Sequence, residues 1–211
     1  MEILSFDILP STQKFLLEEL KAKRLQAPIA VIAREQSSGI GSRDNKWSGG
    51  AGNFFVSIAI SLNKLPSDLP LSSSSIYFSY IMKKTLEEMG ENVWLKWPND
   101  FYLNREKVGG TITKKMKNIL VFGMGINLKK SENGYSSLQS DIRPEMLLEK
   151  YLERLVKFPE WKQVFSEYQI EFELSRRFSV HIENKRKSLA DATLCEDGSL
   201  IIGGNKVYSS R

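Results

Sequence analysis

The sequence predicts an α+β fold, in which a mixed β-sheet is packed with helices and a small β-barrel follows at the C-terminus. Strand-like runs follow one another with few regular β–α alternations, and this pattern favours a mixed sheet over a doubly wound one. Apolar residues recur at helical spacing in separate stretches, which supply the helices that cover the sheet. We expect a large domain over residues 1–171 and the small barrel domain over residues 172–211.

The N-terminal part is expected to begin with a helix and two buried strands. Ser11 or Thr12 can cap a helix over residues 13–25. Apolar runs predict strands over 28–34 and 53–60. The segment between these strands is long and rich in Gly, Ser and charge, and loops of this length are uncommon in compact domains unless they are functional or disordered.

The middle of the chain is expected to form a buried helix and then a run of strands. After the serines at 72–75, a helix is indicated by Phe78, Met82, Leu86 and Met89, and Gly90 ends it. Short polar turns separate the strands that follow, which are expected over residues 93–97, 101–103, 108–114 and 119–128.

The C-terminal part is expected to contain two helices and a small β unit. Pro144 opens a helix to about residue 156, and Pro159 precedes a second helix to about residue 174. Short alternating strands fill residues 177–211, with turns at Asp197-Gly198 and at Gly203-Gly204-Asn205.

Composition narrows the class of protein. A hydrophobic fraction of 41% with 26% charged residues is typical of a folded soluble protein. No apolar run reaches the roughly 18 residues that span a bilayer, and Glu2 precedes the first apolar residues without a basic region, which argues against a secretory signal. We therefore expect a cytoplasmic protein with no membrane contact. The net charge of +5 fits an anionic ligand or partner.

Two residue types limit the chemistry. Cys195 is the single cysteine, so an internal disulfide and a cysteine metal cluster are excluded. His181 is the single histidine, so a Ser-His or Cys-His arrangement would have to use that residue. We expect both residues to be structural.

The most informative segment is residues 93–111, VWLKWPNDFYLNREKVGGT. Its Lys96-Trp97-Pro98-Asn99-Asp100 run, followed by Lys107 and Gly109-Gly110, resembles the signature of biotin protein ligases at each of those positions. Bulky residues, a carboxylate, a lysine and two glycines in so short a span indicate a strand-turn-strand unit that presents polar groups to a ligand.

Three further segments match that family in order. Ser11-Thr12-Gln13 resembles its Ser-Thr-Asn stretch, and the Gly123-to-Leu128 run resembles its Gly-x-Gly-Ile-Asn strand end. The loop from Gln36 to Trp47 resembles the segment that folds over biotin and the adenylate. In that loop Ile40 and Ser42 replace two arginines of the family pattern, which leaves Arg43 as the nearest residue for the phosphate.

The resemblance implies a role for each matching residue. Lys107, Asp100 and Arg43 are expected to carry the chemistry, with Lys107 between the biotin carboxylate and the α-phosphate and Asp100 toward Mg²⁺. Nucleotide contacts are expected from Arg43, Trp47, Asn99, Lys107 and Asn127. Biotin contacts are expected from Ser11, Thr12, Gln13, Gln36, Gly39, Ile40, Gly41, Lys107, Gly110, Gly123 and Gly125.

The implied activity is an ATP-dependent biotin protein ligase. It would form biotinyl-5'-AMP from biotin and ATP with Mg²⁺, and then transfer biotin to a lysine of the biotin carboxyl carrier protein of acetyl-CoA carboxylase. The Ser-Thr segment begins at residue 11, so we expect the short form without an N-terminal DNA-binding domain, and no DNA partner. A homodimer is left open.

Three alternatives stay open at this stage. A lipoate or octanoyl protein ligase would share the fold. A non-catalytic biotin or adenylate sensor is suggested by the arginines missing at 40 and 42. A nucleic-acid-binding module using the basic C-terminal unit would need an aromatic stacking pattern, which the sequence lacks.

Overall fold

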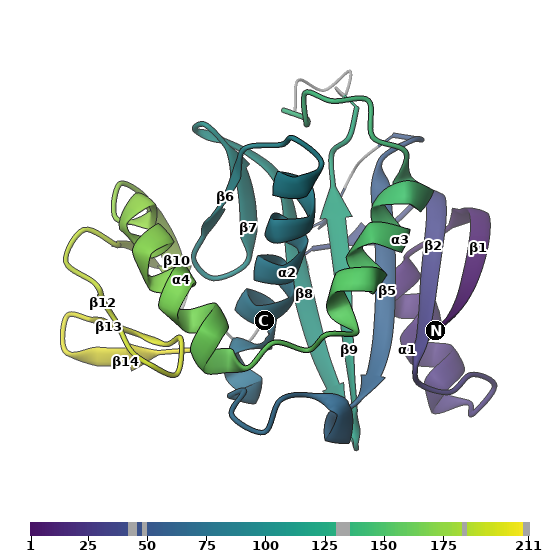
Figure 1. Ribbon diagram of the computed structural model, residues 1–211, viewed down its shortest axis with the longest axis horizontal. Coiled ribbons are helices and arrows are strands. Elements are labelled where there is room, and N and C mark those ends of the chain that lie inside the picture. The colour runs from purple at the N-terminus through teal and green to yellow at the C-terminus, as the bar shows by residue number, and fades with distance from the viewer. Residues whose placement is uncertain (42–45, 48–49, 130–135, 183–184, 209–211) are drawn as a thin grey trace.

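A seven-stranded β-sheet forms the centre of the molecule (Figure 1). The computed structural model describes residues 1–41, 46–47, 50–129, 136–182 and 185–208. The first two strands of the chain lie side by side at one edge of this sheet and are parallel. Every other neighbouring pair in the sheet is antiparallel. The strands are, in spatial order across the sheet, β1 (Glu2–Leu9), β2 (Ile29–Gln36), β5 (Phe54–Ser61), β9 (Ile119–Ile126), β8 (Glu106–Met116), β7 (Asp100–Leu103) and β6 (Val93–Lys96).

Helices cover both faces of this sheet. The helices are α1 (Thr12–Lys21), α2 (Ser74–Glu88), α3 (Pro144–Leu155) and α4 (Trp161–Ser175). Figure 1 shows α2, α3 and α4 on one side of the sheet and α1 on the other, and short 3-10 turns η2 (Leu62–Lys64) and η3 (Leu71–Ser73) lead into α2. The predicted α+β class with a mixed sheet is confirmed.

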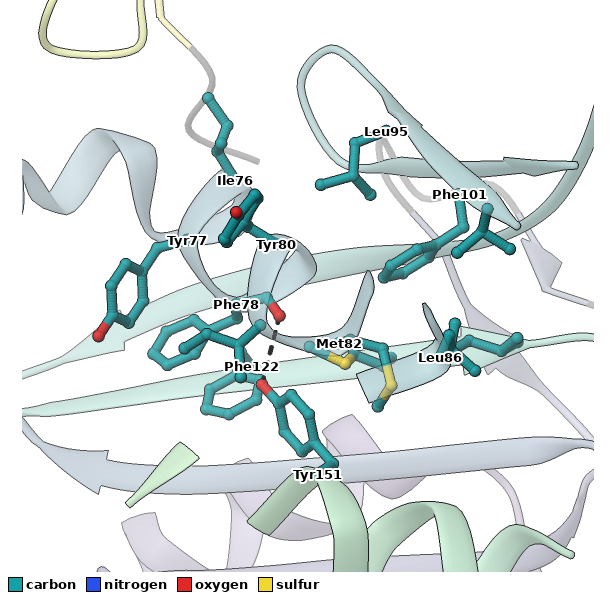
Figure 2. Packing of buried hydrophobic residues seen from close by; sticks show 14 of the residues in the cluster. Ile76, Tyr77, Phe78, Tyr80, Met82, Leu86, Leu95, Phe101, Phe122 and Tyr151 are labelled. Atoms are coloured by element: carbon teal, nitrogen blue, oxygen red, sulfur yellow. Dashed lines mark hydrogen bonds between the residues drawn. The ribbon is translucent and has the colours of Figure 1, made fainter. Parts of the chain in front are cut away.

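The larger core lies between the sheet and helices α2 to α4. Phe78 of α2 stacks on Phe122 of β9 with ring centroids 3.8 Å apart, and Tyr151 of α3 meets Phe122 edge-on (Figure 2). Phe78, Met82 and Leu86 are fully buried, as their spacing predicts. The backbone at Gly90 has a φ of +89°, the left-handed conformation that favours glycine after a helix end.

A smaller core lies under α1. Leu16 and Leu20 pack there against apolar residues of β2, β5 and β9. The helix ends at Lys21, four residues before the expected end at Leu25. Lys23 has a φ of 59°, so the chain turns out of the helical conformation before Leu25, which packs partly buried beside this core.

Strand β1 was not predicted from the sequence. It is an edge strand whose burial does not follow a clear alternation, and Ile3 and Ile8 are exposed. Its run of β-favouring residues, ILSFDIL, is the signal that could have indicated it.

The C-terminal segment forms two small antiparallel sheets. Gly203 and Gly204 both have positive φ and make the two-residue turn between β13 and β14. One sheet pairs β10 (Ser179–Ile182) with β11 (Lys185–Ser188), and the other joins β12 (Thr193–Leu194), β13 (Leu200–Ile202) and β14 (Asn205–Val207).

These sheets are packed onto the rest of the molecule. Val180, Leu189, Ala192 and Leu200 belong to the same buried cluster as the residues under α2. Helix α4 spans residues 171 and 172, where the sequence placed a domain boundary. The division into domains 1–171 and 172–211 stays a prediction.

Among the described residues, none of the helices is both long and apolar enough to cross a bilayer.

Candidate active site

The α1 face of the sheet is hollowed where β8 and β9 carry glycines. Gly110 lies opposite Gly125 in the β8–β9 pairing, and Gly123 lies two residues away along β9. Ser57 of β5 lies opposite Gly123 on the other side. These small residues line a cavity of about 250 Å³.

Side chains approach the glycines so closely that larger residues would not fit. A Cβ built on Gly123 would lie 2.7 Å from Oε1 of Gln13, and one on Gly125 would lie 2.7 Å from Cε2 of Trp47. Glycine is therefore required at both positions to keep these two side chains where they are.

One wall of the cavity is the start of α1. Ser11 caps the helix by accepting a hydrogen bond from the backbone N–H of Lys14. Oε1 of Gln36 accepts hydrogen bonds from the backbone N and the hydroxyl of Thr12, at 2.8 and 3.1 Å. The Thr12 hydroxyl also lies 2.9 Å from the hydroxyl of Ser57, so α1, the end of β2 and the middle of β5 are joined in one polar network.

The opposite wall is the turn between β6 and β7, formed by Trp97, Pro98 and Asn99. The backbone N of Thr111 donates to Asn99 O at 2.9 Å, and the Asn99 side chain donates to Thr111 O. The Thr111 hydroxyl lies 2.8 Å from the hydroxyl of Ser79 on α2. These bonds fix the turn to β8 and place Asp100 opposite Gly110.

Three charged side chains gather at this wall. Nζ of Lys107 lies 2.5 Å from Oδ1 of Asp100, and Nζ of Lys96 lies 3.6 Å from Oδ2 of the same carboxylate. Lys96 is largely buried and also lies over the ring of Tyr102. Burial, and secondarily Asp100, raises the pKa of Tyr102 to about 12, so its hydroxyl stays protonated at neutral pH.

A short hairpin covers the glycine floor. Gly39 and Ile40 form β3 (Gly39–Ile40), which pairs with β4 (Lys46–Trp47). Trp47 lies against Gly125, and Nζ of Lys107 is 6.0 Å from the centre of its ring. The hairpin was not predicted, because strands of two residues carry no periodicity.

Two buried polar atoms at the cavity are without a partner within the described part of the chain. They are Oε1 of Gln13, an acceptor, and Nε1 of Trp47, a donor. Buried polar groups in folded proteins are almost always hydrogen-bonded, so these atoms mark where a polar ligand would complete the site. A ligand with both an N–H and an acceptor oxygen suits them.

The predicted site residues are largely brought together. Arg43 and Ser42 lie outside the described residues, and the predicted role of Arg43 stays a prediction. Gly39 does not line the cavity; a Cβ there would lie 2.6 Å from Trp47 O, so it allows the hairpin to close. The predicted residues that line the cavity are Ser11, Thr12, Gln13, Gln36, Ile40, Gly41, Trp47, Asn99, Asp100, Lys107, Gly110, Gly123, Gly125 and Asn127.

Some lining residues were missed by the sequence analysis. Ser57 is a polar residue within the apolar strand FFVSIAIS, and that contrast was the available signal. Thr111 directly follows the glycine pair and could have been included with it. Val56, Ile112 and Met124 also line the cavity, but nothing in the sequence separates them from core residues.

Comparison with known proteins identifies the family. Residues 5–131, more than half of the chain, match the model of the biotin/lipoate A/B protein ligase family. The chain belongs to this family. The matched range includes both walls, the hairpin and the glycine floor of the site.

Curated members of the ligase family match part of the chain. The bifunctional ligase/repressor BirA of Escherichia coli is 30% identical over 128 residues, which is 57% of this chain and 39% of that protein. The chain thus aligns with well under half the length of this relative. The corresponding protein of Bacillus subtilis is 28% identical over 146 residues, or 43% of its length.

Solved structures of ligase-family proteins match nearly the whole chain. The biotin acetyl coenzyme A carboxylase synthetase of Helicobacter pylori, solved with bound biotinylated ATP, has a TM-score of 0.94 and 39% identity, covering 98% of this chain and 99% of that one. The biotin protein ligase of Aquifex aeolicus, solved with biotin and ATP, has a TM-score of 0.76 at 20% identity, covering 98% and 94%. The likeness to the Aquifex aeolicus protein concerns the fold alone.

Proposed function

We propose that this chain is an ATP-dependent biotin protein ligase. The observation that carries the proposal is the match to the Helicobacter pylori synthetase along nearly the full length of both chains. The cavity supports it, because its floor is made of glycines while its lining includes Lys107 and two buried polar atoms that lack a partner among the described residues.

The proposed reaction has two steps. A carboxylate oxygen of biotin attacks the α-phosphorus of ATP, and the bond to the β-phosphate oxygen breaks to release pyrophosphate. The amine of an acceptor lysine then attacks the acyl carbon of biotinyl-5'-AMP, AMP leaves, and the amine proton passes to solvent. The acceptor would be the biotin carboxyl carrier protein of acetyl-CoA carboxylase.

Lys107 is the residue suited to the first step. Two anions must approach each other, and a fixed ammonium between them offsets their repulsion. This ammonium is paired with Asp100 and lies beside the Trp47 ring, among the residues that line the cavity. The site excludes water around a labile anhydride through the hairpin that carries Trp47.

The remaining contacts are divided between the two ends of the cavity. Biotin would lie on Gly123 and Gly125, with its ureido ring toward Gln13 and the Ser11–Thr12 wall. The adenylate would lie toward Trp47 and the turn that carries Asn99, near Asn127. The side chain of Asn127 donates to Ser136 O at 3.0 Å, which fixes its position at the end of β9.

Magnesium would be held at Asp100 with the nucleotide phosphates. In the portion that the structure describes, no three His, Cys, Asp or Glu side chains gather as a ligand set, so the phosphates and water would complete the coordination. A carboxylate supplies the hard oxygen ligand that Mg²⁺ prefers. Both Asp100 oxygens face lysines, and in the proposed complex Lys107 would turn toward the phosphates and leave one oxygen for the metal.

Transfer assays separate this proposal from its alternatives. The purified protein is incubated with ATP, MgCl₂, a carrier domain and either radiolabelled biotin or lipoate. We expect pyrophosphate release and labelling with biotin and background labelling with lipoate. Labelling by lipoate alone would support a lipoate ligase, and biotin binding without pyrophosphate release would support a sensor.

A further inference from the structure

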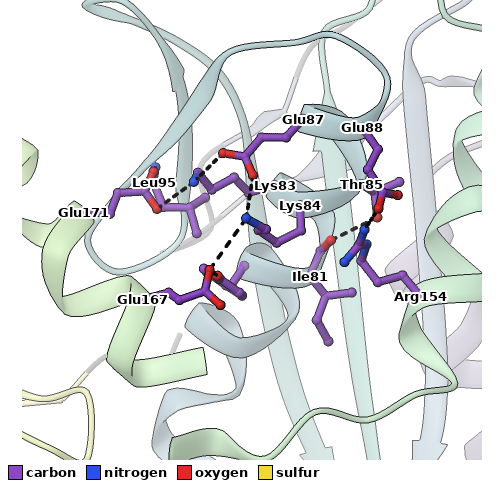
Figure 3. Close-up of polar contacts among 11 residues, drawn as sticks. Ile81, Lys83, Lys84, Thr85, Glu87, Glu88, Leu95, Arg154, Glu167 and Glu171 are labelled. Atoms are coloured by element: carbon purple, nitrogen blue, oxygen red, sulfur yellow. Dashed lines mark hydrogen bonds and ion pairs between the residues drawn. The ribbon is translucent and has the colours of Figure 1, made fainter. Parts of the chain in front are cut away.

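The outer edge of the sheet at β6 is closed by side chains rather than by another strand. Glu171 of α4 accepts a hydrogen bond from the backbone N of Leu95 at 3.0 Å, as Figure 3 shows. One helical turn later, the fully buried hydroxyl of Ser175 accepts from the backbone N of Trp97 at 3.1 Å and faces Leu95 O at 3.5 Å. These are the backbone groups that an eighth strand would otherwise pair.

A second contact reaches the same place from the C-terminal segment. The indole Nε1 of Trp97 donates to Gly198 O at 2.9 Å, and the Trp97 side chain is fully buried. Gly198 lies in a turn closed by its own N–H to Cys195 O. The same turn is held by Trp161 Nε1 on Glu196 O and by the Ser73 hydroxyl on Asp197 O.

Trp97 is joined directly to the polar wall of the cavity. It is followed by Pro98, Asn99 and Asp100, so its position determines where the Asp100 carboxylate meets Lys107. Glu171, Ser175 and Gly198 all lie beyond residue 131, outside the range that the family model matches. The wall inside that range is therefore held by residues outside it as well as by its own bonds to β8.

We propose that Glu171, Ser175 and the Cys195–Ser199 turn form a clamp that positions Asn99 and Asp100 for the nucleotide. None of the clamp residues lines the cavity. They act through β6 and Trp97, so they are positioning residues. The inference rests on the proposed ligase function, because it assigns the clamp to the ATP end of that site.

The clamp is expected to affect the use of ATP and the binding of biotin to different extents. The glycine floor and the Ser11–Gln13 wall are carried by α1, β5, β8 and β9, whereas the clamp holds β6 at the far edge. Loosening the clamp should therefore weaken ATP use more than biotin binding. A general loss of folding would lower both together.

Glu171→Ala tests the clamp with Glu167→Ala as its matched control. Glu167 lies one turn earlier on α4 and pairs with Lys84 and Tyr80, but in the described structure it bonds no group of β6 (Figure 3). We expect Glu171→Ala to raise the KM for ATP in pyrophosphate exchange by about tenfold or more, since small displacements of positioned groups have effects of this size. The biotin Kd should stay within about twofold, because the clamp is remote from the biotin wall.

Glu171→Gln should restore much of the activity, because its amide oxygen can still accept from Leu95 N. Hydrogen exchange gives an independent reading: the Leu95 and Trp97 amides should lose protection in Glu171→Ala and keep it in Glu167→Ala. Equal KM values for the two alanine variants would overturn the clamp, and so would a parallel loss of biotin and ATP binding.

A second pair tests the C-terminal turn and covers the case in which Glu171→Ala does not fold. A Cβ on Gly198, where φ is +74°, would lie 2.5 Å from the Ser73 hydroxyl, whereas Gly203, with φ +56°, has nothing within 4 Å. Gly198→Ala and Gly203→Ala thus carry similar backbone strain, and we expect the ATP-selective defect in Gly198→Ala alone. The same defect in both variants would overturn the role of the turn.

The outcomes also separate the clamp from the ligase function. If the wild type gives no pyrophosphate exchange, the proposed function fails. Hydrogen exchange at the Leu95 and Trp97 amides, compared between wild type and Glu171→Ala, still decides whether the clamp exists. If the wild type is active and Glu171→Ala behaves as Glu167→Ala does, the function stands and the clamp fails.

Discussion

Nζ of Lys107 lies 2.5 Å from Oδ1 of Asp100, so a cation of β8 and an anion of β7 neutralise each other at the wall of the cavity. In the proposed reaction Lys107 must leave this partner to join two substrate anions. Because Lys107 is assigned to the two substrate anions and Asp100 to Mg²⁺, the two residues should have separate, testable effects.

We expect Lys107→Ala to fold and to lower the rate of adenylate formation by about 10²–10³-fold, the usual effect of removing a preorganised charge at a reacting group. Pyrophosphate exchange measures this step directly. Lys114→Ala is the control, since Lys114 is an exposed lysine of the same strand away from the cavity. Comparable rates for the two variants would remove Lys107 from the mechanism.

Asp100→Asn should weaken the response to Mg²⁺ more than it weakens biotin binding. The amide keeps the size of the side chain but loses the charge that attracts the metal, and Lys107 loses an anionic partner while keeping a hydrogen-bond acceptor. Titrating MgCl₂ in the exchange assay, beside biotin calorimetry, separates these effects. A larger loss in biotin affinity than in the Mg²⁺ response would contradict the assignment.

Gly125→Ala should reduce biotin affinity, because its Cβ would lie 2.7 Å from the Trp47 ring and would displace the cover of the cavity. Overpacking of this kind costs about 1–3 kcal/mol. Gly50→Ala is the control, since a Cβ there meets nothing within 4 Å. Calorimetry with biotin should distinguish the two variants, and equal affinities would show that the ring gives way freely.

Glu171 should make stability depend on pH in a defined direction. Burial raises the pKa of its carboxyl, against the opposing effects of Lys83 and the Leu95 N–H. Protonation is thus favoured in the folded state, so this stabilisation is complete below the ordinary carboxyl pKa and is lost as the pH rises through the raised one.

Urea unfolding at a series of pH values can check this. Relative to Glu171→Gln, which does not titrate, the wild type should gain stability as the pH falls through that window. Parallel curves for the two proteins would show that Glu171 does not titrate differently in the folded and unfolded states.

Much of the central fold was predictable because its elements carry their own periodicity. The face of α2 and the strands of the sheet around β5 and β9 follow from apolar runs alone. Strand β1 escaped prediction because Ile3 and Ile8 are exposed at an edge, where burial does not impose a pattern. The end of α1 was predicted too late in the sequence. The chain leaves the helix through a left-handed conformation at Lys23, and a lysine gives no sequence signal for that conformation.

Asn99, Asp100, Lys107 and Gly110 were predicted as site residues because their short motifs resemble the family signature, and they line one cavity in the structure. The residues elsewhere in the chain that hold these motifs in place were not predictable. Glu171 and Ser175 read in the sequence as ordinary polar residues of a helix, and only the packing of α4 against β6 gives them backbone groups to bind. Such long-range contacts have no local sequence signal.

The glycine floor limits how the specificity of this cavity can change. Because Gly110, Gly123 and Gly125 already lack side chains, a substitution at any of them can only make the cavity shallower. A variant that accepts a bulkier acid would have to gain its space sideways, by shortening Ile112 of β8. Acceptance of larger ligands thus requires substitutions in the walls of the cavity, whereas a preference for smaller ligands can be obtained by substituting the floor glycines.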